Sequence, residues 1–403
     1  MGDGIGALVG VRVVDLTRIL AGPFCTQMLG DHGADVIKIE ALEGDETRRW
    51  GPPFSEDGMS AYFRGVNRNK RSLALDLSSK AGQAVLFRLL GNADVLIENF
   101  KAGQMEKWGL GYDPTLRDRF PQLIYGQITG YGLDGPLAGR PGFDAIAQVM
   151  SGLASINGAA DGPPVRVGAP ISDLSAAFYA ANAILMALYE RNRSGAGQKV
   201  DVSLLDCSVS LLHPHAANYF MSGDPPRRIG NSHPNIAPYE MFQTANGFIF
   251  IAGGNNRQFE RLVTFLGKPE LAKDIRFSNN SARKANEKML TSELSSLLID
   301  RDGPVLAEEL LADGVPAGAV LEVPQVLDHP QVRARDMVVE DGKYQGIGVS
   351  VKMSRTPGRP RVSPPKLGEH TYDVLSEAGY NDREIEKFLR LRVVGGIPSS
   401  EVA

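Results

Sequence analysis

Asp173 is the residue whose type and position point most directly to chemistry. It follows Gly168–Ser172, a turn rich in small residues, and it opens a helical pattern that ends near Gly195. The start of a helix presents unpaired N–H groups and the positive end of the helix dipole, which keep a carboxylate ionised. An ionised carboxylate can act as a nucleophile, although most aspartates in this setting only cap the helix.

A second carboxylate and a pair of glycines are weaker candidates. Asp144, in the segment Pro141–Ala145, fits either a second catalytic carboxylate or a helix cap, and the cap is the simpler interpretation. Gly253 and Gly254 fit either a plain β-turn or a loop whose backbone approaches a ligand and donates N–H groups to it. The residues alone leave these alternatives open.

Residue type and spacing argue against several other kinds of site. No glycine fingerprint follows the first expected strand, so a nicotinamide site is not expected. Only His213 and His215 lie close together among the histidines, and their spacing points them apart on a helix, so no metal site is expected. A formal net charge of -4 gives no basic footprint for nucleic acid.

Length and composition are those of an ordinary globular protein in a reducing compartment. The 403 residues exceed one typical domain, and 43% of them are hydrophobic. The two cysteines, Cys25 and Cys207, cannot build a disulfide framework. No apolar run is expected to span a membrane, and residues 1–6 lack the features of a signal peptide. We therefore expect a cytoplasmic protein with no nucleic-acid or membrane partner.

The scaffold for these candidates is an alternation of strands and helices in the first half of the chain. A helix is expected over Ser79–Leu90, with Ser79 as its cap. The expected strands are Val11–Leu16, Val36–Glu40, Leu73–Leu77, Val95–Asn99 and Leu123–Ile128. The helix after Asp173 is expected to bury a stripe made of Leu174, Phe178, Ala181, Leu185 and Leu188.

This spacing predicts an α/β fold with a doubly wound parallel sheet. Strands separated by twenty or more residues leave room for the crossover helices that parallel strands need. Ligands of such sheets bind beyond the carboxyl ends of the strands. Polar groups follow three of the expected strands there, at Asp15–Arg18, Glu98–Lys101 and Thr129–Gly132.

Two changes of composition divide the rest of the chain. Ser222–Arg228 is rich in turn-forming and charged residues, and the chain becomes more polar again after Val323–Gln325. Between them, a strand is expected at Phe248–Ala252 and helices at Arg257–Leu266 and Met289–Leu298. We expect a middle domain flanked by two segments of a larger one.

Ordered blocks along almost the whole chain resemble the class III CoA-transferase family, of the CaiB/BaiF type. Asp173 falls where that family has its catalytic aspartate. The matching blocks are Asp15–Pro23, Gly33–Glu40, Asn67–Ser72, Glu98–Phe100 and Thr129–Gly132. A narrower likeness, to the succinyl-CoA:glutarate branch, involves Trp50–Phe54, His215–Tyr219, Pro238–Tyr239 and Gly253–Phe259. The resemblance implies CoA transfer from an acyl-CoA such as succinyl-CoA to a dicarboxylate such as glutarate, with no permanently bound cofactor.

Two alternatives accompany this interpretation. The family also contains acyl-CoA racemases, which use a histidine–aspartate pair, and their histidine falls at Phe143 in this chain. A phenylalanine cannot move a proton, so transfer is favoured over racemisation. A CoA-binding protein without catalytic activity would bind CoA tightly but exchange it with no carboxylate.

The resemblance also implies a role for particular residues. Asp173 would pass through an acyl–aspartyl anhydride and an aspartyl-CoA thioester, beneath a lid formed by Gly253 and Gly254. Tyr131 would lie near the thioester. The residues implied to line the CoA site are Arg18, Ile19, Ala21, Lys70, Arg71, Asn99, Phe100 and Lys107. The candidates for holding the acceptor's distal carboxylate are Arg48, Arg49, His215, Asn218 and His233.

The architecture implied by the resemblance has a Rossmann-like large domain and a smaller α+β domain. Residues 1–224 would begin the large domain, residues 225–325 would form the small domain, and residues 326–403 would return to the large one. The implied assembly is a homodimer whose two chains interlock.

Overall fold

The computed structural model describes residues 6–342 and 344–396, and it divides into two compact units. The argument about a signal peptide therefore rests mainly on residues outside the described part. Among the described residues, unit 1 comprises 6–151, 167–211, 330–342 and 344–396, and unit 2 comprises Gly152–Arg166 and Leu212–His329. Unit 2 thus extends beyond the expected boundaries at residues 225 and 325, and it also includes an earlier segment of the chain.

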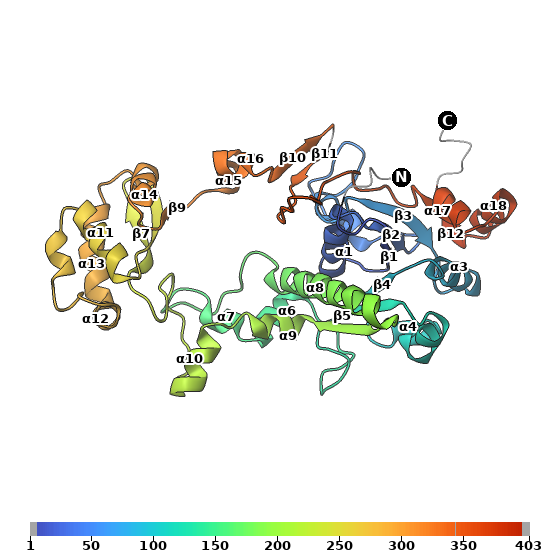
Figure 1. The fold of residues 1–403 in the computed structure, drawn as a ribbon, viewed down its shortest axis with the longest axis horizontal. Helices are drawn as coiled ribbons and strands as arrows, with labels where there is room; N and C mark the ends of the chain where they lie inside the picture. Colours follow the sequence, from blue (N-terminus) through green and yellow to red (C-terminus); the bar gives the residue numbers. More distant parts are fainter. Residues whose placement is uncertain (1–5, 343, 397–403) are drawn as a thin grey trace. The chain divides into compact units, whose positions relative to one another are not determined.

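Unit 1 is built on a seven-stranded sheet (Figure 1). Its strands lie in the order β12-β3-β2-β1-β4-β5-β6, and all neighbours pair in parallel except β12, which is antiparallel to β3. Their bounds are β1 Arg12–Asp15, β2 Asp35–Glu40, β3 Lys70–Leu75, β4 Val95–Glu98, β5 Ile124–Thr129, β6 Lys199–Ser203 and β12 Val394–Gly395. The five expected strands are confirmed to within a few residues. The strand order reverses between β1 and β4, which makes that point the usual ligand position of a doubly wound sheet.

Helices cover both faces of this sheet. Val13 and Val14 of β1 point to opposite layers, because successive side chains of a strand alternate between faces. One layer contains α3 (Lys80–Leu90) and α17 (Thr371–Glu377), and the other contains α1 (Ala21–Asp31), α8 (Ile171–Ser194) and α9 (Leu204–Ser210). The expected cap of α3 is confirmed, because the Ser79 side chain accepts a hydrogen bond from the Gly82 N–H.

The remaining elements of unit 1 are short. Its other helices are α2 Ala61–Gly65, α4 Gln104–Lys107, α5 Arg117–Arg119, α6 Asp144–Met150, α16 Pro330–Ala334 and α18 Asp382–Arg390, with helical turns at Glu46–Arg49 and Tyr112–Leu116. An antiparallel hairpin joins β10 (Val338–Asp341) to β11 (Tyr344–Ile347). Of these elements, α2 and α6 matter most for the site described below.

The long helix α8 differs from expectation in two respects. Asp173 is its third residue and not its cap, which is Pro170. The buried stripe was predicted only in part, because Ala181 and Leu188 are buried whereas Phe178 and Leu185 are 48% and 42% exposed. The side chains that α8 buries are mainly small: Ser172, Ser175, Ala176, Ala177, Ala180, Ala181, Ile184, Ala187 and Leu188. The helix ends as expected at a left-handed Gly195, whose φ is 75°.

The expectation that no apolar run could span a membrane also needs correction. By length and composition α8 is apolar enough, with a mean hydropathy of 1.4 over its best window. Half of that window is buried inside the protein, where α8 packs on α1, α6 and α9. This burial is typical of the core helix of a globular fold.

Unit 2 combines a three-stranded antiparallel sheet with helices. The sheet has the order β7-β8-β9, with bounds Tyr239–Thr244, Gly247–Ala252 and Ala317–Ala319. Its helices are α7 Leu153–Ile156, α10 His215–Ser222, α11 Asn256–Phe265, α12 Asn280–Ala285, α13 Glu287–Leu298, α14 Gly303–Ala312 and α15 Val323–Asp328, with a turn at Pro269–Ala272. The expected strand Phe248–Ala252 and both expected helices are confirmed. Ile249, Phe259 and Leu294 lie in the core between sheet and helices.

Candidate active site

The first turn of α8 lies at the carboxyl edge of the large sheet. Strands β5 and β6 are parallel neighbours, and α8 lies between them in the chain. A crossover helix must run back from the carboxyl ends of the strands to their amino ends. Asp173, at the beginning of α8, is therefore on the ligand-binding edge.

Asp144 caps α8 and not the helix to which it belongs. Its Oδ1 accepts hydrogen bonds from the N–H of Ser172 at 2.8 Å and from the N–H of Asp173 at 3.3 Å. In its own helix, α6, the cap position is Phe143, which provides no side-chain hydrogen bond. The interpretation of Asp144 as a helix cap is thus correct in kind, but the helix it caps is the one that begins at Ile171.

The carboxylate of Asp173 is half-buried and has no hydrogen-bond partner among residues 6–342 and 344–396. Burial, together with the nearby charge of Asp144, raises its pKa to about 7. The expectation that the helix start keeps this group fully ionised is therefore wrong, because burial and the like charge outweigh the helix dipole. The result is an unusually basic carboxylate with free lone pairs.

Tyr131 lies beside α6, the helix that begins at Asp144. The loops at Gly130 and Gly142 touch through their backbones, since a Cβ on Gly130 would lie 2.6 Å from the Gly142 Cα. The Tyr131 hydroxyl donates a hydrogen bond to the Met150 sulfur of α6 at 3.4 Å. The contact of the two glycines thus brings the loop after β5 to the start of α6.

Tyr62 of α2 is a neighbour of the site that the sequence did not indicate. Burial and the charges of Asp173, Asp144 and Asp45 raise its pKa to about 12. Its ring makes an edge contact with Trp50, with centroids 5.0 Å apart. The only sequence signal nearby was the block Trp50–Phe54, which carries the family resemblance but gives Tyr62 no role.

A cavity of about 870 Å³ lies at the carboxyl ends of β1, β2, β3 and β4. It therefore includes the point where the strand order reverses. Its walls are Leu16–Arg18, Ile39–Glu46, Arg49, Leu75–Ser78, Phe100–Lys101, Gln104, Trp108 and Arg392. All of these residues belong to unit 1.

Four basic side chains line this cavity: Arg18, Arg49, Lys101 and Arg392. All four residues are exposed, and none forms an ion pair within the described part of the chain. Phe100 and Trp108 pack edge to face at 5.3 Å, and the Arg18 guanidinium lies 5.3 Å from the centre of the Phe100 ring. Free cations beside aromatic rings suit a ligand with several phosphates and a flat base. Sequence reasoning missed Arg392, because only the fold brings the C-terminal segment to this edge.

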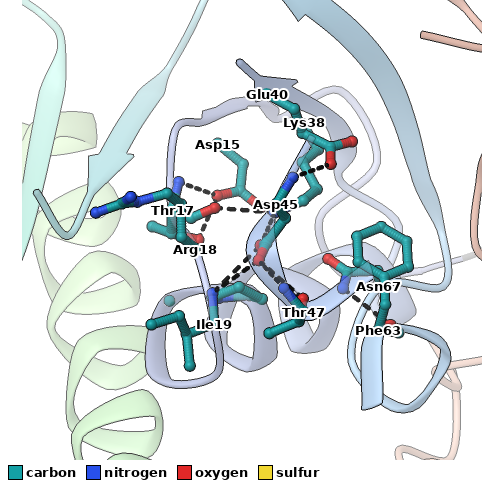
Figure 2. A network of polar contacts seen from close by, with 12 residues as sticks. Asp15, Thr17, Arg18, Ile19, Lys38, Glu40, Asp45, Thr47, Phe63 and Asn67 are labelled. Carbon is teal, nitrogen blue, oxygen red and sulfur yellow. Dashed lines mark hydrogen bonds and ion pairs between the residues drawn. The ribbon is translucent and has the colours of Figure 1, made fainter. Parts of the chain in front are cut away.

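A buried network of charges (Figure 2) includes Thr17, Glu40 and Asp45, which also line the cavity. The Asp45 carboxylate accepts hydrogen bonds from the Ile19 N–H at 3.2 Å, the Thr47 N–H at 3.0 Å and the Lys38 Nζ at 3.1 Å. Burial alone would lower the pKa of Lys38, but the charges of Asp15 and Asp45 outweigh it and the pKa is raised. Ile19 is held at φ 70°, a conformation that a β-branched residue rarely adopts.

The residues implied for CoA binding fall into two groups. Arg18 and Phe100 line the cavity, and Asn99 links their loops, because its amide exchanges two 2.8 Å hydrogen bonds with the Arg18 backbone. Ile19 and Ala21 stand at the nearby start of α1. Lys107 is exposed on α4 but does not line the cavity.

Lys70 and Arg71 do not line this cavity. Both stand at the beginning of β3, whereas the cavity uses Leu75–Ser78 at its end, about 16 Å further along at about 3.3 Å per residue. Lys70 is fully buried, and its ammonium donates to Asp15, Asn67 and the Pro23 carbonyl. Arg71 is paired with Asp35 and Glu377. Both side chains stabilise the fold, and their donors are already in use.

Arg48 is likewise unsuited to hold a substrate carboxylate. Its guanidinium makes two 2.7 Å hydrogen bonds to Glu40 and a third to the Pro365 carbonyl, and it stacks 3.7 Å from the Phe63 ring. The neighbouring Arg49 is the cation that faces the cavity. Of the two candidate arginines, Arg49 is therefore the one whose guanidinium forms no ion pair within the described residues.

The other substrate candidates lie together in unit 2. Asn235 connects two of them, because it exchanges amide hydrogen bonds with Asn218 and donates its N–H to the His233 Nδ1 at 3.0 Å. Burial lowers the pKa of both His215 and His233, and the two rings are close enough for His215 to contribute to the shift at His233. The structure thus gathers His215, Asn218 and His233 into one polar cluster.

Gly253 and Gly254 form a turn between β8 and α11 that a buried arginine anchors. Arg283 of α12 is fully buried and donates to the Gly254 carbonyl at 2.9 Å and to the Asn256 side chain at 3.0 Å. A Cβ on Gly254 would lie 2.2 Å from a methyl carbon of Ile236, so only glycine fits here without rearrangement. The turn belongs to unit 2, whereas Asp173 belongs to unit 1.

Comparison with known proteins gives a consistent picture. Residues 8–371 match CoA-transferase family III. The chain is 44% identical to succinate–glutarate CoA-transferase of Agrobacterium fabrum over 92% of this chain and 95% of that protein. It is 40% identical to succinyl-CoA:mesaconate CoA-transferase of Haloarcula hispanica over 93% of this chain and 97% of that protein. A solved CaiB/BaiF family protein from Brucella suis superposes with a TM-score of 0.84 at 43% identity, covering 93% of this chain and 100% of that chain.

These likenesses extend over the parts of the chain that carry the site. The matched range contains the cavity loops after β1 to β4, Asp173 and the glycine turn. The family match agrees with the resemblance seen in the blocks of sequence. It also agrees with the fold, with the position of Asp173 and with the cavity where the strand order reverses. The chain therefore belongs to CoA-transferase family III.

Proposed function

We propose that this protein transfers CoA from an acyl-CoA donor, with succinyl-CoA first among them, to a dicarboxylate acceptor such as glutarate, and that Asp173 is the covalent nucleophile. The observation that carries the proposal is the Asp173 carboxylate at the ligand-binding edge, which no described residue hydrogen-bonds and whose pKa is raised to about 7 by burial and by Asp144. A more basic carboxylate is a better nucleophile once it is ionised. The family relatives named for succinate–glutarate and succinyl-CoA:mesaconate transfer support this donor and this class of acceptor.

In the first half of the proposed reaction, Asp173 takes CoA from the donor. One Asp173 oxygen attacks the thioester carbonyl, the C–S bond breaks, and an acyl–aspartyl anhydride and a CoA thiolate form. The thiolate then attacks the aspartyl carbonyl, so that CoA becomes attached to Asp173. The donor acid leaves with the bridging oxygen, which came from Asp173.

The second half reverses these steps with the acceptor. Its carboxylate attacks the aspartyl-CoA thioester and releases the thiolate, and the thiolate attacks the acceptor carbonyl of the new anhydride. The acceptor leaves as its CoA thioester, and Asp173 recovers a carboxylate that contains one oxygen from the acceptor. Both intermediates are sensitive to water, so the reaction needs a closed site. We assign this closure to the Gly253–Gly254 turn and the position nearest the thioester to Tyr131.

We further propose that the 870 Å³ cavity holds the nucleotide end of CoA. Arg18, Arg49, Lys101 and Arg392 would contact its phosphates, and Phe100 with Trp108 would flank the adenine. Ile19, Ala21 and Asn99 shape the neighbouring loops. For the distal carboxylate of the acceptor, the cluster of His215, Asn218 and His233 is the best-supported candidate, because its donors are gathered in one place.

The racemase alternative has less support. Phe143 is 59% exposed and stands directly before Asp144, where a racemase has its histidine. Because phenylalanine cannot accept or donate a proton, the pair of groups needed to exchange a proton next to a thioester is incomplete. Deuterium uptake at the α-carbon of a 2-methylacyl-CoA would favour racemisation instead.

Replacement of the nucleophile tests the proposed function. With succinyl-CoA and a panel of dicarboxylates, Asp173→Ala is expected to lose all measurable CoA transfer while it still binds CoA and melts cooperatively. Substantial transfer by this variant would rule out the covalent route. A single turnover with heavy-oxygen-labelled acceptor then tests the intermediates: the label should appear on the peptide that contains Asp173 and not in the first succinate released.

We also propose that the protein acts as a homodimer. Exposed apolar side chains gather on three helices of unit 1 that contact one another, α6, α8 and α9. They are Ile146, Val149, Phe178, Leu185, Met186, Tyr189 and Val209, and we call them the α8 face. An apolar surface of this kind on a water-soluble fold is typical of a subunit contact. A second copy of the chain is the partner that the family resemblance implies.

A further inference from the structure

Helix α6 holds the backbone from which the Asp173 side chain projects. Asp144, its first residue, accepts hydrogen bonds through Oδ1 from the N–H groups of Ser172 and Asp173, at 2.8 Å and 3.3 Å. These are two of the N–H groups that a helix leaves unpaired at its start. The nucleophile's own backbone N–H is thus bonded to a carboxylate from another helix.

Gln148, one turn further along α6, completes this support. Its side chain is fully buried, and its Nε2 donates to the other Asp144 oxygen, Oδ2, at 2.8 Å. Its Oε1 accepts a hydrogen bond from the Val167 N–H at 2.8 Å. Asp144 and Gln148 together therefore fix both the first turn of α8 and the loop that leads into it.

The two neighbouring carboxylates have opposite surroundings. Both oxygens of Asp144 accept hydrogen bonds, whereas those of Asp173 accept none within the described part of the chain. The charge of Asp144 is one of the two causes, after burial, that raise the pKa of Asp173. This asymmetry gives the pair a nucleophile and a fixed neighbouring charge.

Other titratable groups near α8 do not account for the behaviour of Asp173. Cys25 of α1 and Cys207 of α9 are buried, which raises the pKa of each thiol and keeps it neutral at pH 7. Tyr62 of α2 stays neutral for the same reason. Among the charged groups, only Asp144 contributes to the raised pKa of Asp173. The charged residues of the neighbouring elements that do not contribute are Asp31 on α1, Asp206 on α9, and Lys199 and Asp201 on β6.

We propose that Asp144 is a positioning residue that fixes the backbone of Asp173 and places a negative charge beside its carboxylate. This inference rests on the proposed function, in which Asp173 is the nucleophile. A negative charge beside the nucleophile disfavours its ionised ground state, and the charge leaves Asp173 when it attacks the thioester. Asp144 thus positions the Asp173 backbone through Oδ1, and its charge makes the Asp173 carboxylate more reactive.

A pair of variants separates these two contributions. Asp144→Asn keeps an oxygen that can accept the N–H groups of Ser172 and Asp173 but removes the charge, whereas Asp144→Ala removes both. The matched control is Asp206→Asn, which removes an exposed acidic residue from the first turn of the neighbouring helix α9. Circular dichroism and melting curves establish that each variant is folded.

The first readout is the protonation of Asp173 itself, which needs no knowledge of the substrate. A water-soluble carbodiimide with an amine modifies protonated carboxyl groups, and peptide mass spectrometry measures the extent at Asp173 across neutral pH. In Asp144→Asn the midpoint should fall by about one pH unit relative to the wild type and to Asp206→Asn. A midpoint equal to that of the wild type would overturn the electrostatic part of the inference, whether or not CoA transfer has been observed.

The second readout is kinetic. For Asp144→Asn, the acid limb of the kcat/KM profile should move to lower pH, with kcat above the midpoint reduced several-fold. For Asp144→Ala, kcat should fall about 100-fold with little change in the KM for the acyl-CoA, because a misplaced nucleophile affects the chemical step. Unchanged kcat in a folded Asp144→Ala protein would overturn the positioning part. If the Ala variant does not fold, the Asn variant still decides the electrostatic part.

Discussion

At the scale of single residues, Asp173 and Asp144 differ in what their carboxylate oxygens contact. Asp144 is bonded to two backbone N–H groups and to Gln148, while Asp173 is half-buried with its oxygens free within the described part of the chain. Burial and a like charge penalise the ionised form of Asp173, and no hydrogen bond from the described residues offsets this penalty. The ionised Asp173 side chain therefore lowers the stability of the folded protein, and the same surroundings make it more reactive. Such a trade-off between stability and activity is common in active sites.

The raised pKa of Asp173 predicts how stability depends on pH. The folded protein holds a proton on this group between its unfolded pKa of 3.8 and its folded pKa of about 7, so stability falls as pH rises through that window. Asp173→Asn should remove this loss. At pH 8 the variant should gain on the order of 4 kcal/mol in the free energy of unfolding, and below pH 4 it should match the wild type.

Urea unfolding at several pH values measures this difference. Intact mass must show that the introduced asparagine has not deamidated, since deamidation would restore the aspartate. The prediction fails if the variant is equally or less stable than the wild type at pH 8, because Asp173 would then not be destabilised in its ionised form.

The residue scale also shows where sequence reasoning reached its limit. Asp173 could be found, because it follows a distinctive turn and matches the family's catalytic position. The direction of its pKa shift could not be found, because Asp144 lies far before it in the chain and no local pattern shows that it caps α8. Lys70 was a ligand candidate through the family resemblance, and Arg48 as a cation able to hold a carboxylate, whereas here both are paired with buried carboxylates.

At the scale of elements, the loop after β1 depends on the buried network beneath it. The Asp45 carboxylate accepts a hydrogen bond from the N–H of Ile19, whose φ is 70°. It also forms an ion pair with Lys38, and both of these side chains are fully buried. A left-handed isoleucine costs about 1–2 kcal/mol, so the loop keeps this shape only while its partners are in place. The network therefore connects folding stability to the shape of the cavity.

Asp45→Ala tests this connection. Removing the carboxylate leaves Lys38 buried without its ion-pair partner, which should cost about 3–5 kcal/mol of unfolding free energy. Asp118→Ala is a suitable control, because Asp118 forms an exposed ion pair with Arg117 that should be worth less than about 1 kcal/mol. Chemical unfolding compares the two variants, and CoA titration should show weaker binding only for Asp45→Ala. Equal stability of both variants would mean that the network does not support the loop.

Elements were predicted well where one pattern determined them and poorly where tertiary packing did. The parallel strands β1 to β5 were identified because each is a short apolar run followed by a long crossover, whereas β6, which is parallel to β5, was missed. The buried face of α8 was not, because its large apolar residues suggested a core stripe while its alanines make the close contacts with α1 and α9. Large residues such as Phe178 and Met186 remain at the surface, 48% and 66% exposed.

At the scale of the whole molecule, the division of the chain follows contacts that composition does not show. Unit 2 includes Gly152–Arg166, and Arg228 connects this segment to the rest of the unit through hydrogen bonds to the Gly162 and Ser155 carbonyls. The turn-rich segment at Ser222–Arg228 therefore lies within unit 2, although its composition suggested a boundary. A change of composition marks a surface segment, but only contacts decide to which unit that segment belongs.

The α8 face predicts the behaviour of the molecule in solution. Because apolar surface of this extent is unfavourable in water, two copies of the chain should cover it, and light scattering should give twice the mass of one chain. If the chains interlock, dilution should leave the dimer intact, since separation would require partial unfolding.

Met186→Glu combined with Tyr189→Glu places charges on this face and should prevent assembly, whereas Ile275→Glu, at an exposed residue of unit 2, should not. A wild-type monomer would show that the face has another partner, and a dimer that dissociates reversibly on dilution while remaining folded would show that its chains do not interlock.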